Sequence, residues 1–299
     1  MAIAGTANWP AWRIWLAASR PKTLPAAIAP VVVGTAIAHK LGGFAAGPAL
    51  AALLGALLLQ IGANFANDYF DWKQGADTAE RQGPMRVTQA GLVSPSQILT
   101  ATAITFGLAT LTGVYLTLVA GWPIVVLGLA SILAAIAYTG GPFPLGYRGL
   151  GEVTVFVFFG LAAVMGTVYV QVHSLAPLAA WLSVPMGALS AAILVVNNLR
   201  DRHTDAQCGK RTIAVRFGGE FTRSLYVALL TLAFGLPCVL VALGLLDRGA
   251  FIALLALPLA VPPLKTVLAA EGPVLNGALA GTARLLAGYA LALALGLLV

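Results

Sequence analysis

Charged residues are scarce in this chain. They form 9% of its 299 residues, and the mean hydropathy is +0.92. An ordinary soluble domain has roughly 25% charged residues. A soluble globule cannot bury so much apolar surface, so the sequence predicts a polytopic membrane protein that has the lipid bilayer as a partner. The same scarcity excludes a soluble basic domain, and with it a nucleic-acid partner.

Cysteine is nearly absent as well. Cys208 and Cys238 are the two in the chain, which excludes a disulfide framework and a cysteine-based metal site. The N-terminal segment lacks an apolar run that ends at a small-residue cleavage site, so we expect no cleavable signal peptide. Residues 1–22 instead carry three tryptophans, which are typical of a segment at the membrane interface.

Long apolar runs fill the rest of the chain. A membrane span needs about 20 apolar residues. By this criterion the sequence predicts an all-α polytopic protein, residues 1–299 forming a single domain of nine transmembrane helices. The nine spans are expected at about 23–39, 47–67, 97–119, 122–138, 152–172, 178–198, 222–246, 249–268 and 275–298.

Lysine and arginine are distributed unevenly between the predicted loops. With nine spans, 14 of the 17 fall on the side of the N-terminus, while Lys40 and Arg248 fall on the other side and Arg284 lies inside the last span. Basic residues concentrate in cytoplasmic loops. We therefore expect a multi-pass protein of the cell inner (cytoplasmic) membrane with a cytoplasmic N-terminus. Loops 67–96 and 199–221 would lie on the cytoplasmic side.

Acidic residues gather in these two loops. The chain has ten, of which six closely follow the second and sixth spans and a seventh, Glu220, lies at the end of the second loop. Each of the two spans has an asparagine near its end, and two aspartates follow it at helical intervals, which puts an amide and two carboxylates on one helix face. The two sets are Asn64, Asp68 and Asp71, and Asn197, Asp201 and Asp205. We interpret them as a weak internal repeat whose halves face one central cavity.

Bare carboxylates facing each other would repel, so these oxygen ligands favour Mg²⁺, which also bridges substrate phosphates. Four basic residues near the acids suit a phosphate: Lys73, Arg86, Lys210 and Arg211. The simpler alternative for one such loop is a solvated charged surface, and Glu80 and Arg81 fit that description. Glu152 is expected to form a local ion pair with Arg148.

Five stretches carry a resemblance to a known family. "NDYFDWKQGAD" (67–77) and "NNLRDRHTD" (197–205) resemble the two aspartate-rich motifs of UbiA-type intramembrane aromatic prenyltransferases. "RPKTLPAAIAPVVVGTA" (20–36), "YTGGPFPLGYRGLGE" (138–152) and "NNLRDRHTDAQCGKRTIAVRFG" (197–218) are similar to the branch that prenylates 1,4-dihydroxy-2-naphthoate in menaquinone or phylloquinone biosynthesis. The resemblance covers nearly the whole chain and implies a helical bundle around a central cavity.

The resemblance also implies roles for single residues. The carboxylates of Asp68, Asp71, Asp201 and Asp205 would be catalytic, holding Mg²⁺ (or Mn²⁺ as a substitute) and through it the diphosphate of a polyprenyl diphosphate donor. Asn64 and Asn197 would support this metal site, and Asp77 matches the last acid of the first motif, although it stands farther from Asp71 than in the hydroxybenzoate branch. Lys22, Tyr138 and Arg148 would lie near the diphosphate.

The implied reaction joins the polyprenyl group to 1,4-dihydroxy-2-naphthoate with loss of CO₂ and diphosphate, giving a demethylmenaquinol. One alternative is a sister enzyme with another aromatic acceptor, such as 4-hydroxybenzoate or homogentisate. Another is a secondary transporter, although transporters bind near the bilayer midplane and these acids lie at the cytoplasmic ends. A CDP-alcohol phosphotransferase would group its acids in one motif, a pattern that is not found here.

Overall fold

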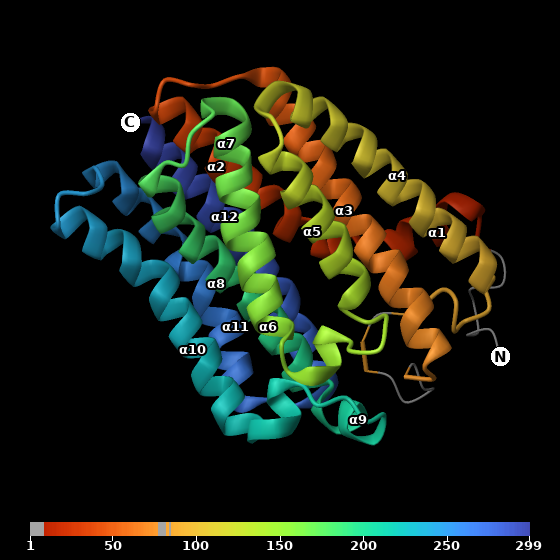
Figure 1. Ribbon diagram of the computed structural model, residues 1–299. Helices are drawn as coiled ribbons and strands as arrows, with labels where there is room; N and C mark the ends of the chain where they lie inside the picture. The colour runs from red at the N-terminus through yellow and green to blue at the C-terminus, as the bar shows by residue number, and fades with distance from the viewer. Residues whose placement is uncertain (1–8, 77–81, 84) are drawn as a thin grey trace.

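The fold is a bundle of long helices (Figure 1). The computed structural model describes residues 9–76, 82–83 and 85–299, and within these ranges every regular element is helical. The α-helices are α1 (Ala11–Ser19), α2 (Pro25–Lys40), α3 (Ala46–Lys73), α4 (Pro95–Ala120), α5 (Pro123–Ala137), α6 (Gly151–Val155), α7 (Ala163–Val172), α8 (Pro177–Arg200), α9 (Arg202–Gln207), α10 (Ile213–Ala242), α11 (Leu257–Ala269) and α12 (Leu275–Leu298). Short 3₁₀ turns and one π segment, Phe156–Ala162, join or extend them.

Proline marks the start of several helices. Four helices have it as their first residue: Pro25, Pro95, Pro123 and Pro177. Proline suits this position because its missing N–H has no intrahelical partner there and its φ is already helical. Helix α4 adds a capping box, in which the Ser94 hydroxyl accepts from the Gln97 amide and the Gln97 side chain accepts from the Ser94 amide. These local signals fix the residues at which the helices begin.

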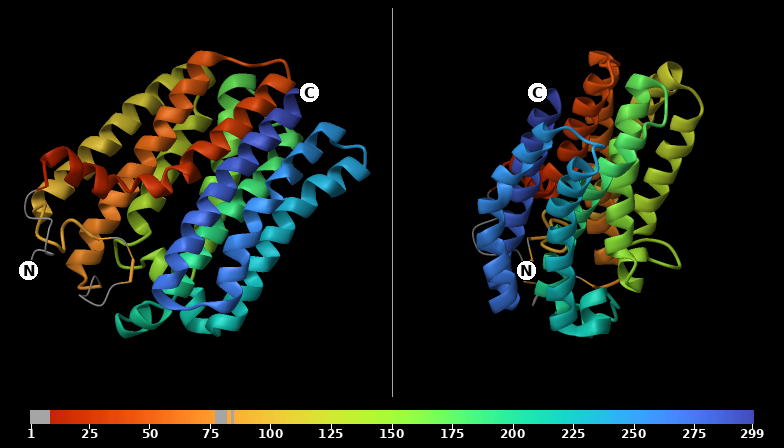
Figure 2. Two further views of the ribbon diagram at one scale, coloured as in Figure 1. Left: turned by 180° about the vertical axis from the view of Figure 1, so that it is seen from behind. Right: turned by 90° about the vertical axis from the view of Figure 1, so that its left-hand side faces the viewer.

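Helix α8 forms the centre of the bundle. In its apolar 18-residue stretch, 72% of the residues are buried, against 28–50% in the corresponding stretches of the other six long helices. It packs against α10, α12 and the π segment, and Figure 2 shows these helices running side by side. Gly160 and Gly187 meet where the π segment crosses α8, because a Cβ on Gly160 would lie 2.7 Å from the Gly187 Cα. Small residues allow such close approach between membrane helices.

All nine predicted spans are helical, but not all are long enough to cross a membrane by themselves. Seven helices satisfy length and hydropathy criteria, and an eighth does so if the bent pair Ala11–Thr23 and Pro25–Lys40 counts as one span. The fourth predicted span is α5, with 15 residues. The eighth begins as a 3₁₀ segment, Arg248–Ala256, and continues as α11, whose second residue is Pro258. Proline removes the α-helical hydrogen bond one turn before it.

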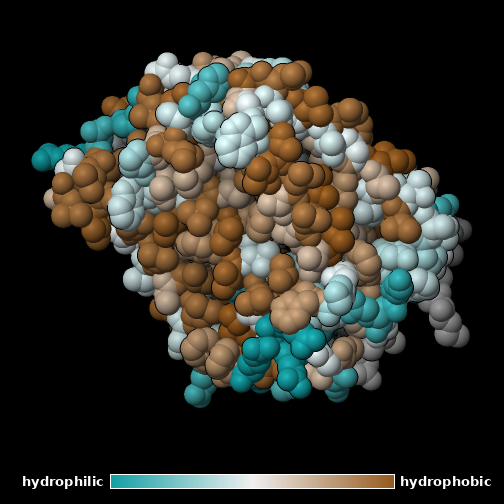
Figure 3. Space-filling view, in the orientation of Figure 1, coloured by the Kyte–Doolittle hydropathy of each residue, from teal (hydrophilic) through white to brown (hydrophobic). Residues whose placement is uncertain are grey.

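The outer surface is apolar over much of its height. Figure 3 shows hydrophobic side chains across the middle of one face and hydrophilic ones gathered at the end that carries α9. Large exposed side chains such as Leu111, Leu118 and Leu255 lie on the long helices. With seven or eight candidate spans, this is a multi-pass membrane protein, because such a surface is stable only in contact with lipid.

Candidate functional site

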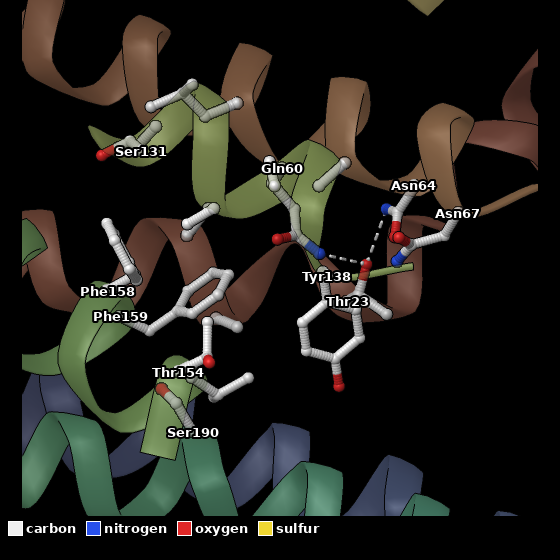
Figure 4. A pocket seen from close by; sticks show the side chains of 18 of the residues that line it. Thr23, Gln60, Asn64, Asn67, Ser131, Tyr138, Thr154, Phe158, Phe159 and Ser190 are labelled. Atoms are coloured by element: carbon white, nitrogen blue, oxygen red, sulfur yellow. Dashed lines mark hydrogen bonds between the residues drawn. The ribbon is translucent and has the colours of Figure 1, made fainter. Parts of the chain in front are cut away.

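A cavity of about 940 Å³ opens between the helices. Its walls come from α2 to α8 and from α12, and one end is polar while the rest is mostly apolar. Figure 4 shows Tyr138 projecting into it between the α3 wall, which carries Gln60, Asn64 and Asn67, and the α8 wall, which carries Ser190. A polar end joined to a long apolar chamber suits a ligand with a charged head and a greasy tail.

The first half of the polar end is the C-terminal part of α3, which continues to Lys73 as expected. Asp71 lines the cavity and is buried. Its carboxylate accepts hydrogen bonds from Arg86 Nη2 at 2.5 Å, Tyr147 Oη at 2.5 Å and Lys210 Nζ at 3.3 Å. Asn67 also lines the cavity, and its Oδ1 accepts from Thr139 Oγ1. Asp71 is therefore bound by two cationic donors and one phenolic hydroxyl.

Asn64 and Asp68 have different surroundings. Asn64 reaches the cavity but donates its amide hydrogens to the Ser19 carbonyl and the Thr23 hydroxyl (Figure 4). Asp68 accepts hydrogen bonds from the backbone N–H groups of Val87, at 3.2 Å, and Thr88, at 3.1 Å. Among the described residues that line the cavity, Asp68 does not occur. Through these two hydrogen bonds, Asp68 holds in place the segment that carries Arg86.

The second half of the polar end lies where α8 stops. The helix was expected to run on through Asp205, but it ends at Arg200, and Asp201 has φ −91° and ψ 5° before α9 begins. Asn197, Asp201 and Asp205 all line the cavity nevertheless. The break turns the chain so that Asp205 approaches from a separate short helix.

Arg200 organises this second half. It is almost completely buried and makes two hydrogen bonds to the Asp201 carboxylate, of 2.8 and 2.6 Å. It also donates to the Oδ1 atoms of Asn197 and Asn276, both at 2.8 Å. A planar guanidinium is suited to such bidentate contact. From the sequence, Arg200 was one of the basic residues on the N-terminal side of the membrane, and its spacing did not predict a role in the site.

The two halves meet through Lys210. Its Nζ lies 3.3 Å from Asp71 and 4.0 Å from Asp205. The residues that face each other are Asn67 and Asp71 on one side and Asn197 and Asp201 on the other. Both pairs have the spacing i, i+4, as do Asn64 and Asp68, of which Asn64 lines the cavity and Asp68 does not. Asp77, Glu80 and Arg81 lie outside the described residues.

The predicted diphosphate ligands divide into two groups. Lys22, Arg86, Tyr138 and Lys210 line the cavity. Lys73, Arg148 and Arg211 are exposed and are not among the described lining residues. Arg148 lies over the Phe143 ring at 5.0 Å and forms no ion pair with Glu152. Instead, Glu152 is buried and accepts a hydrogen bond from Asn198. Tyr147 and Asn276 belong to the cavity and were not predicted.

The site fits a divalent cation only with help from a substrate. In the ranges that the structure describes, no three His, Cys, Asp or Glu side chains lie close enough together to hold a metal ion. Five side chains at the polar end do offer oxygen atoms: Asn67, Asp71, Asn197, Asp201 and Asp205. Such hard ligands suit Mg²⁺, which keeps waters and takes further oxygens from substrate phosphates.

Comparisons with known proteins agree with this architecture. The chain is 42% identical over 281 residues to a 1,4-dihydroxy-2-naphthoate octaprenyltransferase of Mycobacterium leprae, covering 94% of each chain. It is 40% identical over 266 residues to the Escherichia coli protein of the same name, covering 87% of this chain and 86% of that one.

Two solved structures share the fold at 14% identity. An apo UbiA homolog from Aeropyrum pernix has a TM-score of 0.71, and a UbiA homolog from Archaeoglobus fulgidus bound to DMAPP and Mg²⁺ has 0.65; each comparison covers 93% of this chain and 98% of the other. The model of the UbiA prenyltransferase family matches residues 27–270. This chain is therefore a member of the UbiA prenyltransferase family.

Proposed function

We propose that the protein transfers a polyprenyl group from polyprenyl diphosphate to 1,4-dihydroxy-2-naphthoate, with loss of CO₂ and diphosphate, to give a demethylmenaquinol. The observation that carries the proposal is the meeting of Asp71 and Asp205 through Lys210 at the polar end of an apolar cavity. The names of the relatives at 40–42% identity support the choice of acceptor.

The metal set that we propose differs from the one expected from spacing. Asn67, Asp71, Asn197, Asp201 and Asp205 would hold Mg²⁺, since these five line the cavity. Asp68 leaves the set because its carboxylate binds the backbone amides of residues 87 and 88. When bound, the metal supplies positive charge that stabilises the leaving diphosphate.

The side chains that line the cavity have two tasks. Lys22, Arg86 and Lys210 bind the diphosphate oxygens and hold the allylic carbon at the mouth of the apolar chamber. The apolar walls, among them Phe158 and Phe159 (Figure 4), exclude water from the allylic cation that forms when the carbon–oxygen bond ionises. The ring carbon that bears the carboxylate then attacks this cation, and loss of CO₂ restores the aromatic ring.

The proposal includes the place of the reaction. The polar end would face the cytoplasm at the inner membrane, where a diphosphate and a carboxylate are available from water. The apolar chamber would receive the tail from the bilayer, which also takes up the product. A donor with a long isoprenoid tail does not suit a soluble pocket, and this accounts for a membrane enzyme.

The test is an assay of the purified protein in detergent. We expect polyprenylated naphthoquinol, identified by mass spectrometry, from a polyprenyl diphosphate and 1,4-dihydroxy-2-naphthoate in the presence of Mg²⁺, and none in excess EDTA. Competition with 4-hydroxybenzoate and homogentisate measures acceptor choice. If the enzyme prenylates either competitor in preference, the proposed acceptor is wrong. If the protein instead catalyses ion-coupled uptake into vesicles and forms no product, it is a transporter.

A further inference from the structure

The aromatic acceptor needs a binding place next to the diphosphate end of the cavity. Its attacking carbon must lie about 3–3.5 Å from the allylic carbon, which is joined to the diphosphate. Two polar side chains on α8 line the cavity at this level and lie outside the proposed metal set, and one of them, Arg200, is bound to Asp201, Asn197 and Asn276. The other is Asn198, three residues before Asp201, which is a rise of about 4.5 Å along the helix.

The amide of Asn198 has a fixed orientation. Its Nδ2 donates a hydrogen bond of 2.9 Å to Glu152 Oε1, and both residues are buried, with 6% and 5% of their surfaces exposed. The residues that the structure describes offer Asn198 Oδ1 no hydrogen bond, and this atom is not sealed from the cavity. Because this contact turns the nitrogen toward Glu152, the oxygen is the acceptor that Asn198 presents to a ligand.

Glu152 gives a second, independent observation. Its other carboxyl oxygen, Oε2, is buried and has no hydrogen-bond partner within the described part of the chain. Leaving a buried acceptor unpaired costs about 1–3 kcal/mol, and such atoms in native proteins usually have a functional explanation. Tyr138 lies close by, since a Cβ on Gly151 would be 3.0 Å from its hydroxyl. Glu152 itself is not among the described lining residues, so it orients Asn198 from behind the wall into which Tyr138 projects (Figure 4).

This small group of residues selects for one kind of ligand. Amide and carboxyl oxygens accept hydrogen bonds, so they bind an O–H group and disfavour a carboxylate. The cations Arg86 and Lys210, on the other side of the polar end, attract anions. A hydroxylated aromatic acid would therefore turn a hydroxyl, and not its carboxylate, toward Asn198.

We propose that Asn198, oriented by Glu152, accepts a hydrogen bond from a phenolic hydroxyl group of the acceptor. This inference rests on the proposed function, since it concerns the second substrate of that reaction. Asn198 is the contact residue, and Glu152 is a positioning residue that acts through it.

The test compares steady-state kinetics for both substrates in purified variants. Asn198→Ala should lower kcat/KM for the dihydroxynaphthoate roughly tenfold, the effect of one lost hydrogen bond, while KM for the polyprenyl diphosphate and the Mg²⁺ concentration for half-maximal rate stay within about twofold of the wild type. Glu152→Leu should act in the same direction. Glu152→Gln, which keeps an Oε1 acceptor for Asn198, should restore most of the activity. Ser183→Ala is the matched control on α8, because its hydroxyl is buried and bonds to the Ala180 carbonyl, away from the cavity lining.

A second readout separates contact from general damage. Naphthoates that lack one of the two hydroxyls serve as acceptors or competitive inhibitors for the wild type and for Asn198→Ala. For one of these analogues the loss of the hydroxyl and the loss of Asn198 should be non-additive. Additive losses with both analogues, or equal losses for donor and acceptor, overturn the inference alone. A wild-type enzyme that prenylates no naphthoate overturns the proposed function together with it.

Discussion

Asp68 and Asp71 are neighbours on α3, yet their carboxylates bind different groups. Asp71 faces Arg86, Tyr147 and Lys210 in the cavity, whereas Asp68 bonds to the amides of residues 87 and 88. We expect Asp71→Asn to lower the turnover number by about 10²–10³-fold, because an active-site charge is lost. Asp68→Asn should lower the turnover number by about tenfold, as is typical of a residue that orients the groups of a site without binding the metal itself.

The dependence of rate on Mg²⁺ distinguishes the two aspartates. Asp71→Asn should need a higher Mg²⁺ concentration for half-maximal rate, whereas Asp68→Asn should keep the wild-type value and lose thermal stability instead. Glu220→Gln is a suitable control, since Glu220 is exposed on α10. If Asp68→Asn needs the same raised Mg²⁺ concentration for half-maximal rate as Asp71→Asn, then Asp68 is also a metal ligand and the proposed metal set is wrong.

The sequence predicted the residues of the candidate site, but their spacing alone does not show which of them line the cavity. Asn64 with Asp68 and Asn67 with Asp71 have the same spacing, and both match Asn197 with Asp201. Each step along a helix turns the side chain by about 100°, and the neighbours of α3 decide that Asn64, Asn67 and Asp71 line the cavity while Asp68 does not. Arg200 was missed for a similar reason, because its partners come from the end of α8 and from Asn276 on α12.

At the scale of elements, hydropathy predicted where the helices lie and misjudged some of their ends. Helix α10 begins at Ile213, well before the expected 222, and passes Gly218, which has φ 82°. A glycine can take this conformation without a steric penalty, and no apolar run signals it. The break at Asp201 and the π segment at Phe156–Ala162 likewise depend on tertiary packing, which a periodicity cannot show.

Close packing of α8 gives a prediction at this scale. A Cβ on Gly160 would meet backbone atoms of α8, with the Ser183 carbonyl oxygen at 2.8 Å and the Gly187 Cα at 2.7 Å. Backbone cannot move aside as a flexible side chain can, so Gly160→Ala should destabilise the protein by about 1–3 kcal/mol. The melting temperature in detergent should fall by about 5 °C. Gly187→Ala should behave alike, because its Cβ would lie 2.7 Å from the Phe156 carbonyl oxygen.

Gly235→Ala is the matched control, since a Cβ there meets nothing within 4 Å. It replaces a helical glycine by a better helix former, so its melting temperature should equal or exceed that of the wild type. Equal melting temperatures for Gly160→Ala and Gly235→Ala would mean that the crossing of the π segment and α8 is looser than described.

At the scale of the whole molecule, the two ends of the bundle differ in charge. The polar end holds the cavity mouth with Arg86, Arg200 and Lys210. The opposite end has the pair Lys40 and Asp247, whose charged atoms are 2.6 Å apart, and Lys40 also reaches the Leu297 carbonyl. Since positive charge favours the cytoplasmic side, the polar end should face the cytoplasm, with the C-terminal helix ending on the other side of the membrane.

Cysteine labelling in the absence of Cys208 and Cys238 tests this orientation. Asp247, with 72% of its side chain exposed, should react as Asp247→Cys with a membrane-impermeant maleimide added to intact spheroplasts. Glu220→Cys, one helix earlier, should react only after permeabilisation, because α10 separates the two positions. The reverse pattern would invert the orientation, and labelling of both from one side would remove α10 from the spans.

The same assay decides the number of crossings, for which length criteria give seven or eight. Nine crossings require that α5, although it has only 15 residues, passes through the membrane and that α2 does so as well. The ends of the chain then lie on opposite sides. Val299→Cys should react from the same side as Asp247→Cys, and Trp12→Cys from the same side as Glu220→Cys. Val299 and Trp12 are both accessible, with exposed fractions of 87% and 67%. If Val299→Cys and Trp12→Cys react from the same side, the count is even, and α5 becomes the first candidate for a helix that enters the bilayer without crossing it.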